Sequence, residues 1–189
     1  MKEFLEAHIR KRLGENPENL DFVLDHFEPV TVAKNEMILK SGKTCNHIYF
    51  IVSGCLQVFV YDDDMNENIR DLIIEDNWCS ELHSFTTGNP ANENIKAIEP
   101  CQLLCISKSN FALLVQKVPQ FNVAYQQILE QSYLNSVYRI NTFVSMSALD
   151  RLKWLMQNRP YLLNRISSKT LASYLGINKD VFSRLKSKL

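Results

Sequence analysis

The sequence predicts an α+β fold in which an antiparallel β-roll with flanking helices is followed by a long helix and a C-terminal helix-turn-helix. Helical periodicity in the first 27 residues gives way to short strands separated by turns, from Pro29 to about Ser107. Apolar residues then recur at helical spacing, and the last 24 residues contain two short amphipathic helices around a glycine. The predicted parts are residues 1–109, 110–146 and 147–189.

Two helices are expected before the strands. One face of the first carries Phe4, Leu5, His8, Ile9 and Leu13, and a second helix with apolar residues from Leu20 to Phe27 follows Asn16-Pro17.

The strand region has turn signals at Ser41-Gly42 and at Ser53-Gly54. Leu56, Val58 and Val60 alternate with other residues, which predicts a strand buried on one face. Three adjacent aspartates, 62–64, are interpreted as a solvated hairpin tip, because the oxygen spacing and central glycine of a calcium-binding EF-hand are missing. Many short strands with regular turns indicate an antiparallel roll or barrel.

A long helix is predicted after the strands, capped by Ser109 or Asn110 and interrupted or bent at Pro119. From Gln120 to Phe143 it would extend about 36 Å, longer than a small roll needs to cover itself. An apolar stripe on such a helix predicts that a second copy packs against it. The alternative is a helix packed only on its own roll.

The last 24 residues, beginning at Ile166, are typical of a helix-turn-helix. A serine pair begins the first helix, Gly176 ends it, and Asn178 caps the second. The inward residues are Leu171, Ala172 and Leu175, then Val181, Phe182, Leu185 and Leu189. The outward residues of the second helix are Lys179, Asp180, Ser183, Arg184 and Ser187, which suit base edges and phosphates of a DNA major groove. A helix pair that merely closes a small domain is the alternative.

The charge distribution favours nucleic acid. The chain has 21 Lys and Arg against 21 Asp and Glu, so it is neutral as a whole. From Ser147 onward, however, nine basic residues accompany only two acidic ones, and the rest of the chain carries the opposite excess. A concentrated positive end on an acidic body is typical of nucleic-acid binding. Phosphate contacts are expected from Lys153, Lys169, Lys186 and Lys188.

No catalytic site, cofactor or metal site is predicted. The chain has five cysteines without a CxxC pair and no export signal, so free thiols are expected. Cys101 and Cys105 would lie about 13 Å apart along a strand, too far for one metal ion. No apolar run approaches the roughly 18 residues of a membrane span, so we expect a cytoplasmic protein. An enzyme using the roll is disfavoured, because His47, Glu81 and His83 are too sparse to form a catalytic set.

The order and spacing of three segments resemble the Crp/Fnr family of bacterial transcription regulators. They are IYFIVSGCLQVFV from Ile48 to Val60, EDNWCSELHSFTTGNPA from Glu75 to Ala91, and the terminal ASYLGINKDVFSRLKSKL. The resemblance implies a cyclic-nucleotide-binding-like jelly roll, a two-fold dimer built by the long helix, and helix-turn-helix units that a ligand reorients. It also implies double-stranded DNA with a pseudo-palindromic site, a second copy of the chain and RNA polymerase as partners.

The segment that resembles the phosphate-binding cassette departs from the family pattern. The family has a Gly-Glu step and an arginine about ten residues later, which pairs with the cyclic phosphate. Here Glu81 matches the carboxylate, but Ser80 replaces the glycine and Ala91 stands in place of the arginine. An anion without a fixed cation is costly to bury, so we expect no tight binding of cyclic AMP and a different, unidentified effector if there is one. The candidate pocket residues are Glu81, Leu82, His83, Ala91 and Asn92.

The function predicted from these features is a homodimeric DNA-binding transcription regulator with a degenerate effector pocket. The resemblance places Lys179, Asp180 and Arg184 where the family reads bases, commonly with Arg, Glu and Arg, so the target sequence is expected to differ. Because the sequence stops at Leu189, a full β-hairpin wing is not expected. The alternative is a ligand-sensing or protein-interaction module of the same fold without sequence-specific DNA binding.

Overall fold

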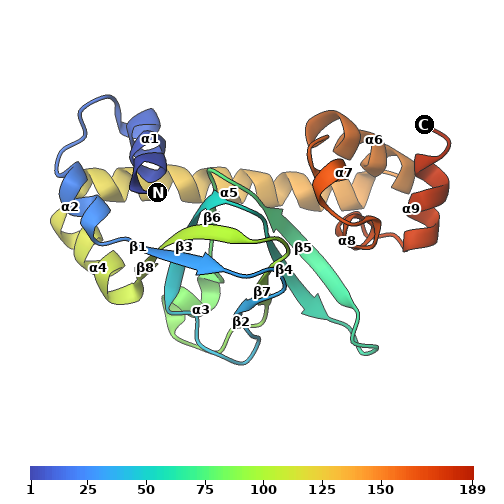
Figure 1. The fold of residues 1–189 in the computed structure, drawn as a ribbon, viewed down its shortest axis with the longest axis horizontal. Helices are drawn as coiled ribbons and strands as arrows, with labels where there is room; N and C mark the ends of the chain where they lie inside the picture. The colour runs from blue at the N-terminus through green and yellow to red at the C-terminus, as the bar shows by residue number, and fades with distance from the viewer. The chain divides into compact units, whose positions relative to one another are not determined.

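The computed structural model describes residues 1–189 and confirms the α+β class (Figure 1). The chain divides into two compact units. The roll unit contains residues 1–58 and 72–130, and the helix-turn-helix unit contains residues 59–71 and 131–189. Three elements contribute residues to both units: β4 (Leu56–Tyr61), β5 (Glu67–Ile73) and α5 (Pro119–Ser145).

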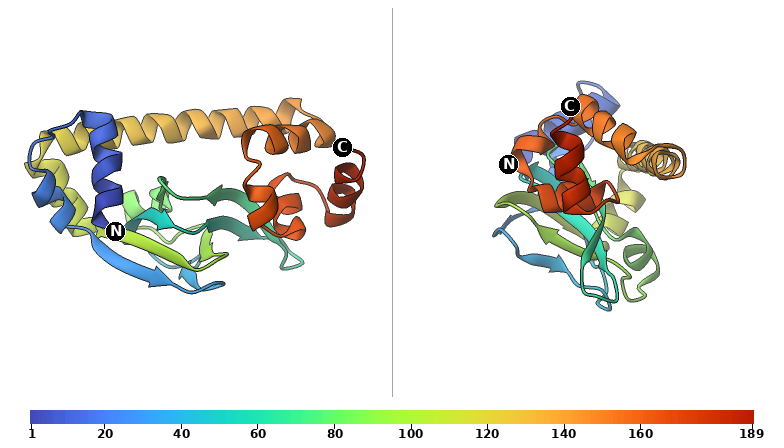
Figure 2. Two further views of the ribbon diagram at one scale, coloured as in Figure 1. Left: turned by 45° about the horizontal axis from the view of Figure 1, so that its top comes forward. Right: turned by 90° about the vertical axis from the view of Figure 1, so that its right-hand side faces the viewer.

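Two four-stranded sheets form the roll, with strand orders β1-β8-β3-β6 and β2-β7-β4-β5. Figure 2 gives two further views of the ribbon. In the first sheet β8 pairs antiparallel with β1 and β3, and β3 pairs antiparallel with β6, as predicted. Tyr49, for example, lies opposite both Cys105 and Cys79. The remaining strands are β1 (Glu28–Val32), β2 (Met37–Leu39), β3 (His47–Ser53), β6 (Trp78–Cys79), β7 (Asn94–Ala97) and β8 (Cys101–Ser107).

The predicted alternation in β4 is wrong. Residues 56–59 are all buried, and Val60 is exposed. Because successive side chains of a strand point to opposite faces, both faces of β4 are covered over its first four residues. The turn before β4 requires glycine, because Gly54 has φ 103° and a Cβ there would lie 2.5 Å from the Cys101 sulfur.

Four helices flank the roll: α1 (Lys2–Leu13), α2 (Leu20–Asp25), α3 (Leu82–Thr87) and α4 (Lys108–Lys117). Leu5, His8 and Ile9 of α1 are buried as predicted, but Phe4 is exposed. The buried face of α1 is therefore narrower than its apolar pattern. The cap of α4 is Ser107, whose hydroxyl accepts from the Asn110 N–H at 3.2 Å. The predicted caps, Ser109 and Asn110, are wrong, because they are the second and third residues of the helix. The interruption at Pro119 is confirmed, since α5 begins there.

The helix-turn-helix unit contains α6 (Ala148–Asn158), α7 (Leu162–Arg165), α8 (Ser168–Tyr174) and α9 (Lys179–Lys186). Ser167 caps α8 and Asn178 caps α9, each through a backbone N–H three residues later. Between the helices Gly176 has φ 65°, which a glycine adopts without strain. The predicted inward position of Leu189 is wrong: it is 54% exposed, because α9 ends before it. None of the helices is both long and apolar enough to cross a membrane.

Candidate nucleic-acid interface and effector cassette

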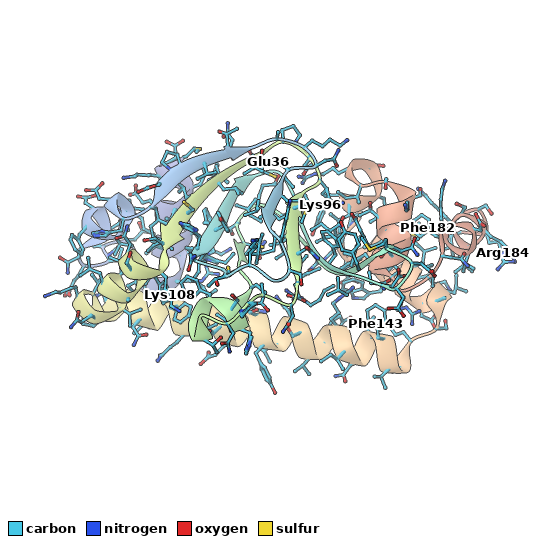
Figure 3. The ribbon with its side chains drawn as sticks, turned by 90° about the horizontal axis from the view of Figure 1, so that it is seen from below. Glu36, Lys96, Lys108, Phe143, Phe182 and Arg184 are labelled. Atoms are coloured by element: carbon cyan, nitrogen blue, oxygen red, sulfur yellow. The ribbon has the colours of Figure 1, made fainter.

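The second helix of the motif, α9, has one buried and one solvent-facing side. Phe182 is completely buried and anchors the helix, with Val181 and Leu185 half-buried beside it. In Figure 3 Phe182 points into the unit and Arg184 points away from it. The five outward residues predicted for α9 are all exposed: Lys179, Asp180, Ser183, Arg184 and Ser187. They therefore form one solvent-facing surface, which we call the reading face.

The charges on α9 suit both the helix and a polyanion. Asp180 lies in the first turn, and Arg184 and Lys186 lie in the last turn, where each complements the helix dipole. No ion pair within the chain engages Lys179, Asp180 or Arg184. These side chains can therefore meet DNA without first breaking an internal pair.

The other residues predicted to contact phosphates are also exposed. Lys169 on α8, and Lys186 and Lys188 at the end of the chain, are exposed, as is Lys153 on α6. Arg151 has a different role, because its guanidinium donates to the carbonyls of Leu175 and Met146, at 2.9 Å each. It holds the unit together.

The carboxylate of Glu81 is used within the cassette. Glu81 is buried and caps α3, accepting from the Ser84 N–H at 2.6 Å. The Ser84 hydroxyl in turn donates to the Asn89 carbonyl at 2.5 Å and accepts from the Cys45 N–H at 2.8 Å. These bonds satisfy the polar groups of the cassette from inside the protein.

Ala91, which replaces the arginine of the family pattern, is 2% exposed and belongs to the core of the roll. Its backbone N–H donates to the Lys43 carbonyl at 2.9 Å, and its carbonyl accepts from the Gly42 N–H at 2.8 Å. The nearby Asn94 side chain accepts from the Ser41 N–H at 3.0 Å. Residue 91 thus presents a methyl group and has both backbone groups hydrogen-bonded within the protein. It offers no positive charge to an anionic ligand.

The candidate pocket residues differ in their exposure to solvent. Leu82 and His83 on α3 and Asn92 before β7 are exposed, whereas Glu81 and Ala91 are buried. Lys96, the nearest downstream cation, is half-buried on β7. The five candidate pocket residues therefore differ in their access to solvent, and their role in ligand binding stays a prediction.

Sequence reasoning missed a hydrogen-bond chain centred on a buried histidine in the roll unit. His8 is buried, its Nδ1 lies 2.5 Å from Asp76 Oδ1, and its Nε2 accepts from the Trp78 indole N–H at 2.8 Å. Because Nε2 accepts, His8 is neutral with its proton on Nδ1. Burial lowers the pKa of His8, although the hydrogen bond with Asp76 opposes that shift. The Trp78 indole required a partner, but a separation of 70 residues concealed which one.

All five cysteines are buried free thiols, as predicted. No three His, Cys, Asp or Glu side chains lie close enough together to bind a metal ion.

Comparison with known proteins agrees with this architecture. Residues 29–118, just under half of the chain, match the cyclic nucleotide-binding domain family. The cAMP-activated global transcriptional regulator CRP of Pasteurella multocida is 22% identical over 139 residues, which cover 74% of this chain and 66% of that protein. The CRP of Salmonella typhimurium is 24% identical over 100 residues, 53% of this chain and 48% of that protein. The match thus spans between about half and two thirds of these relatives.

Two solved structures have the same fold. The c-di-GMP responsive global regulator CLP of Xanthomonas campestris has a TM-score of 0.73 at 16% identity, covering 96% of this chain and 90% of that one. A putative Crp/Fnr-family transcriptional regulator from Eubacterium rectale has a TM-score of 0.70 at 14% identity, covering 92% and 83%. The resemblance indicated by the sequence motifs is therefore confirmed at the level of the fold: residues 29–118 match the cyclic nucleotide-binding domain family, and the chain is similar in fold to a Crp/Fnr-family regulator.

Proposed function

We propose that this chain is a homodimeric, DNA-binding transcription regulator of the Crp/Fnr type. The observation that carries the proposal is the reading face: polar and basic side chains of α9 are exposed on a helix whose opposite side is anchored by Phe182. The similar proteins named above are described as transcriptional regulators or global regulators, which supports the same function. RNA polymerase is the further partner that this function implies.

DNA recognition follows from the chemistry of the reading face. Arg184 can donate two hydrogen bonds to a guanine, and Asp180 can accept from a cytosine amino group. Lys179 and the lysines around the face would contact phosphates, which makes binding strongly salt-dependent. In a two-fold dimer the two α9 helices would enter successive major grooves about 34 Å apart.

The dimer would be formed through α5. Val123, Val137 and Val144 are separated by multiples of seven residues, the spacing of a coiled-coil seam. The exposed apolar residues of α5 include Val123, Tyr133, Leu134, Val137, Ile140 and Val144, the last 80% exposed. Pairing with the same helix of a second copy would bury this surface in the way that a coiled coil does.

The effector site is proposed to be degenerate. A cyclic phosphate at the cassette would meet the methyl group of Ala91 in place of a guanidinium, and Glu81 is already bonded to α3. We therefore expect no tight binding of cyclic AMP. Any other effector would act by binding two settings of the protein with different affinity.

Selection of genomic DNA fragments by the purified protein, with R184A alongside, tests the proposal. The wild type should enrich a two-fold symmetric motif, and R184A should lose one base preference, worth about 1–3 kcal/mol. R10A, which removes an arginine from α1 in the roll unit, is the matched control and should keep the motif. Equal affinity for all duplexes at fixed salt would refute sequence-specific binding and favour a ligand-sensing or protein-interaction module.

A further inference from the structure

The hydroxyl of Ser173 on α8 bonds to two backbone groups of strand β5. It donates to the Glu67 carbonyl at 2.6 Å and accepts from the Ile69 N–H at 3.1 Å. Residues two apart in a strand direct these groups to the same edge, and β5 is the last strand of its sheet. A single side chain of α8 therefore takes the place of a neighbouring strand at this edge.

Arg139 of α5 joins the same two elements. Its Nη2 donates to the Ile69 carbonyl at 3.3 Å and to the Tyr174 carbonyl, at the end of α8, at 2.7 Å. The guanidinium also stacks on the rings of Tyr174 and Phe143, with its central carbon 3.9 and 4.8 Å from their centroids. Burial lowers the pKa of Arg139, and the two carbonyls and two rings compensate for the loss of water.

The turn between α8 and α9 packs on the same part of α5. A Cβ on Gly176 would lie 2.5 Å from the Phe143 ring, so the backbone of the turn touches that ring directly. Arg151 donates to the carbonyl of Leu175, the next residue after the Arg139 contact. The final turn of α8 and the start of the turn are thus held from two sides, and α9 follows within three residues.

We infer that Ser173 and Arg139 are positioning residues for DNA recognition, which fix the setting of α9 by attaching α8 to β5 and α5. This inference rests on the proposed function. The contacts leave the reading face exposed, so they do not compete with DNA. They restrict the orientations of α9, and a preorganised binding element loses less entropy on association. Because β5 and α5 continue into the roll unit, a change there can reach α9 through these two side chains.

The test compares S173A with S136A on the duplex selected by the wild type at one fixed salt concentration. The Ser136 hydroxyl donates only within α5, to the Ser132 carbonyl, so S136A is a matched control. S173A should bind the duplex about tenfold more weakly, since two hydrogen bonds of ordinary strength hold the setting. Hydrogen exchange should accelerate at the Ile69 amide and stay unchanged at the Phe182 amide, which reports an intact α9.

S173T keeps the hydroxyl and should therefore restore the affinity for the duplex. If the serine had only a steric role, the hydroxyl would not be needed for this affinity. Accelerated exchange at Ile69 with wild-type or tighter DNA binding would overturn the inference. If S173A also accelerates exchange at Phe182, S173T decides: restored affinity supports the inference, and affinity as low as that of S173A overturns it. Failure of the wild type to select any duplex would refute the proposed function instead.

Discussion

Replacing His8 by phenylalanine tests whether the hydrogen bonds that the buried His8 makes with Asp76 and Trp78 stabilise the roll unit. In H8F the Trp78 N–H loses its acceptor, and an unsatisfied buried donor costs about 1–3 kcal/mol. The bond from His8 to Asp76 is also lost, but the Asp76 side chain is 56% exposed and regains water, so this part should cost only about 1 kcal/mol. We expect a total loss of about 2–4 kcal/mol in the free energy of unfolding.

Urea unfolding followed by circular dichroism measures this loss, and a second substitution separates its causes. W78F removes the indole N–H, so the double variant H8F/W78F should lose less than the sum of the two single variants. The coupling should be about 1 kcal/mol or more, because replacing both partners by apolar groups leaves no donor without an acceptor. Strict additivity, or a loss below about 0.5 kcal/mol in H8F, would refute the reasoning.

Further predictions concern pH, the glycine turn, the dimer and the ligand. The lowered pKa of His8 adds stability that is present above the unfolded pKa of about 6.5 and is lost as the pH falls through the folded pKa; urea unfolding of H8F should lack this slope. G176A should lower the free energy of unfolding, measured by thermal unfolding, by about 2 kcal/mol or more. G42A should lower it less, because Gly42 also has a positive φ but a Cβ there would have no atom within 4 Å, whereas a Cβ at Gly176 would clash with Phe143. V137E should shift the protein from dimer to monomer in sedimentation at micromolar concentration, and S132E should not. Cyclic AMP should leave the melting temperature unchanged, and a rise of several degrees would contradict the degenerate cassette.

Sequence reasoning succeeded where the decisive contact is local. Asn178 was predicted as the cap of α9, and its partner, the Val181 N–H, is three residues away. The burial of Phe182 follows from helical periodicity alone, which is why the reading face could be predicted from the sequence. A glycine between two such helices marks the turn by the same short-range rule.

It failed where sheet order or a distant residue decides. The alternating pattern from Leu56 to Val60 is compatible with a half-buried strand, but both faces of β4 are covered over residues 56–59, which depends on distant parts of the chain. His8 and Trp78 each look like ordinary core residues until the fold brings them together. The residues that Ser173 contacts on β5 are more than 100 residues away in the sequence. The sequence around Ser173 therefore does not indicate that it attaches α8 to β5.

This division has a consequence for DNA recognition. The residues that would touch DNA are local to α9, but the contacts that orient α9 come from Arg139 and from residues 67–69 of β5. A fragment cut at the boundary that the sequence suggests, residues 147–189, would keep the whole reading face and lose both contacts. The compact unit of the structure includes residues 59–71 and 131–146 as well as residues 147–189. If the setting of α9 matters, this fragment should fold less stably and bind the selected duplex more weakly than a full chain, even with its base-reading side chains intact.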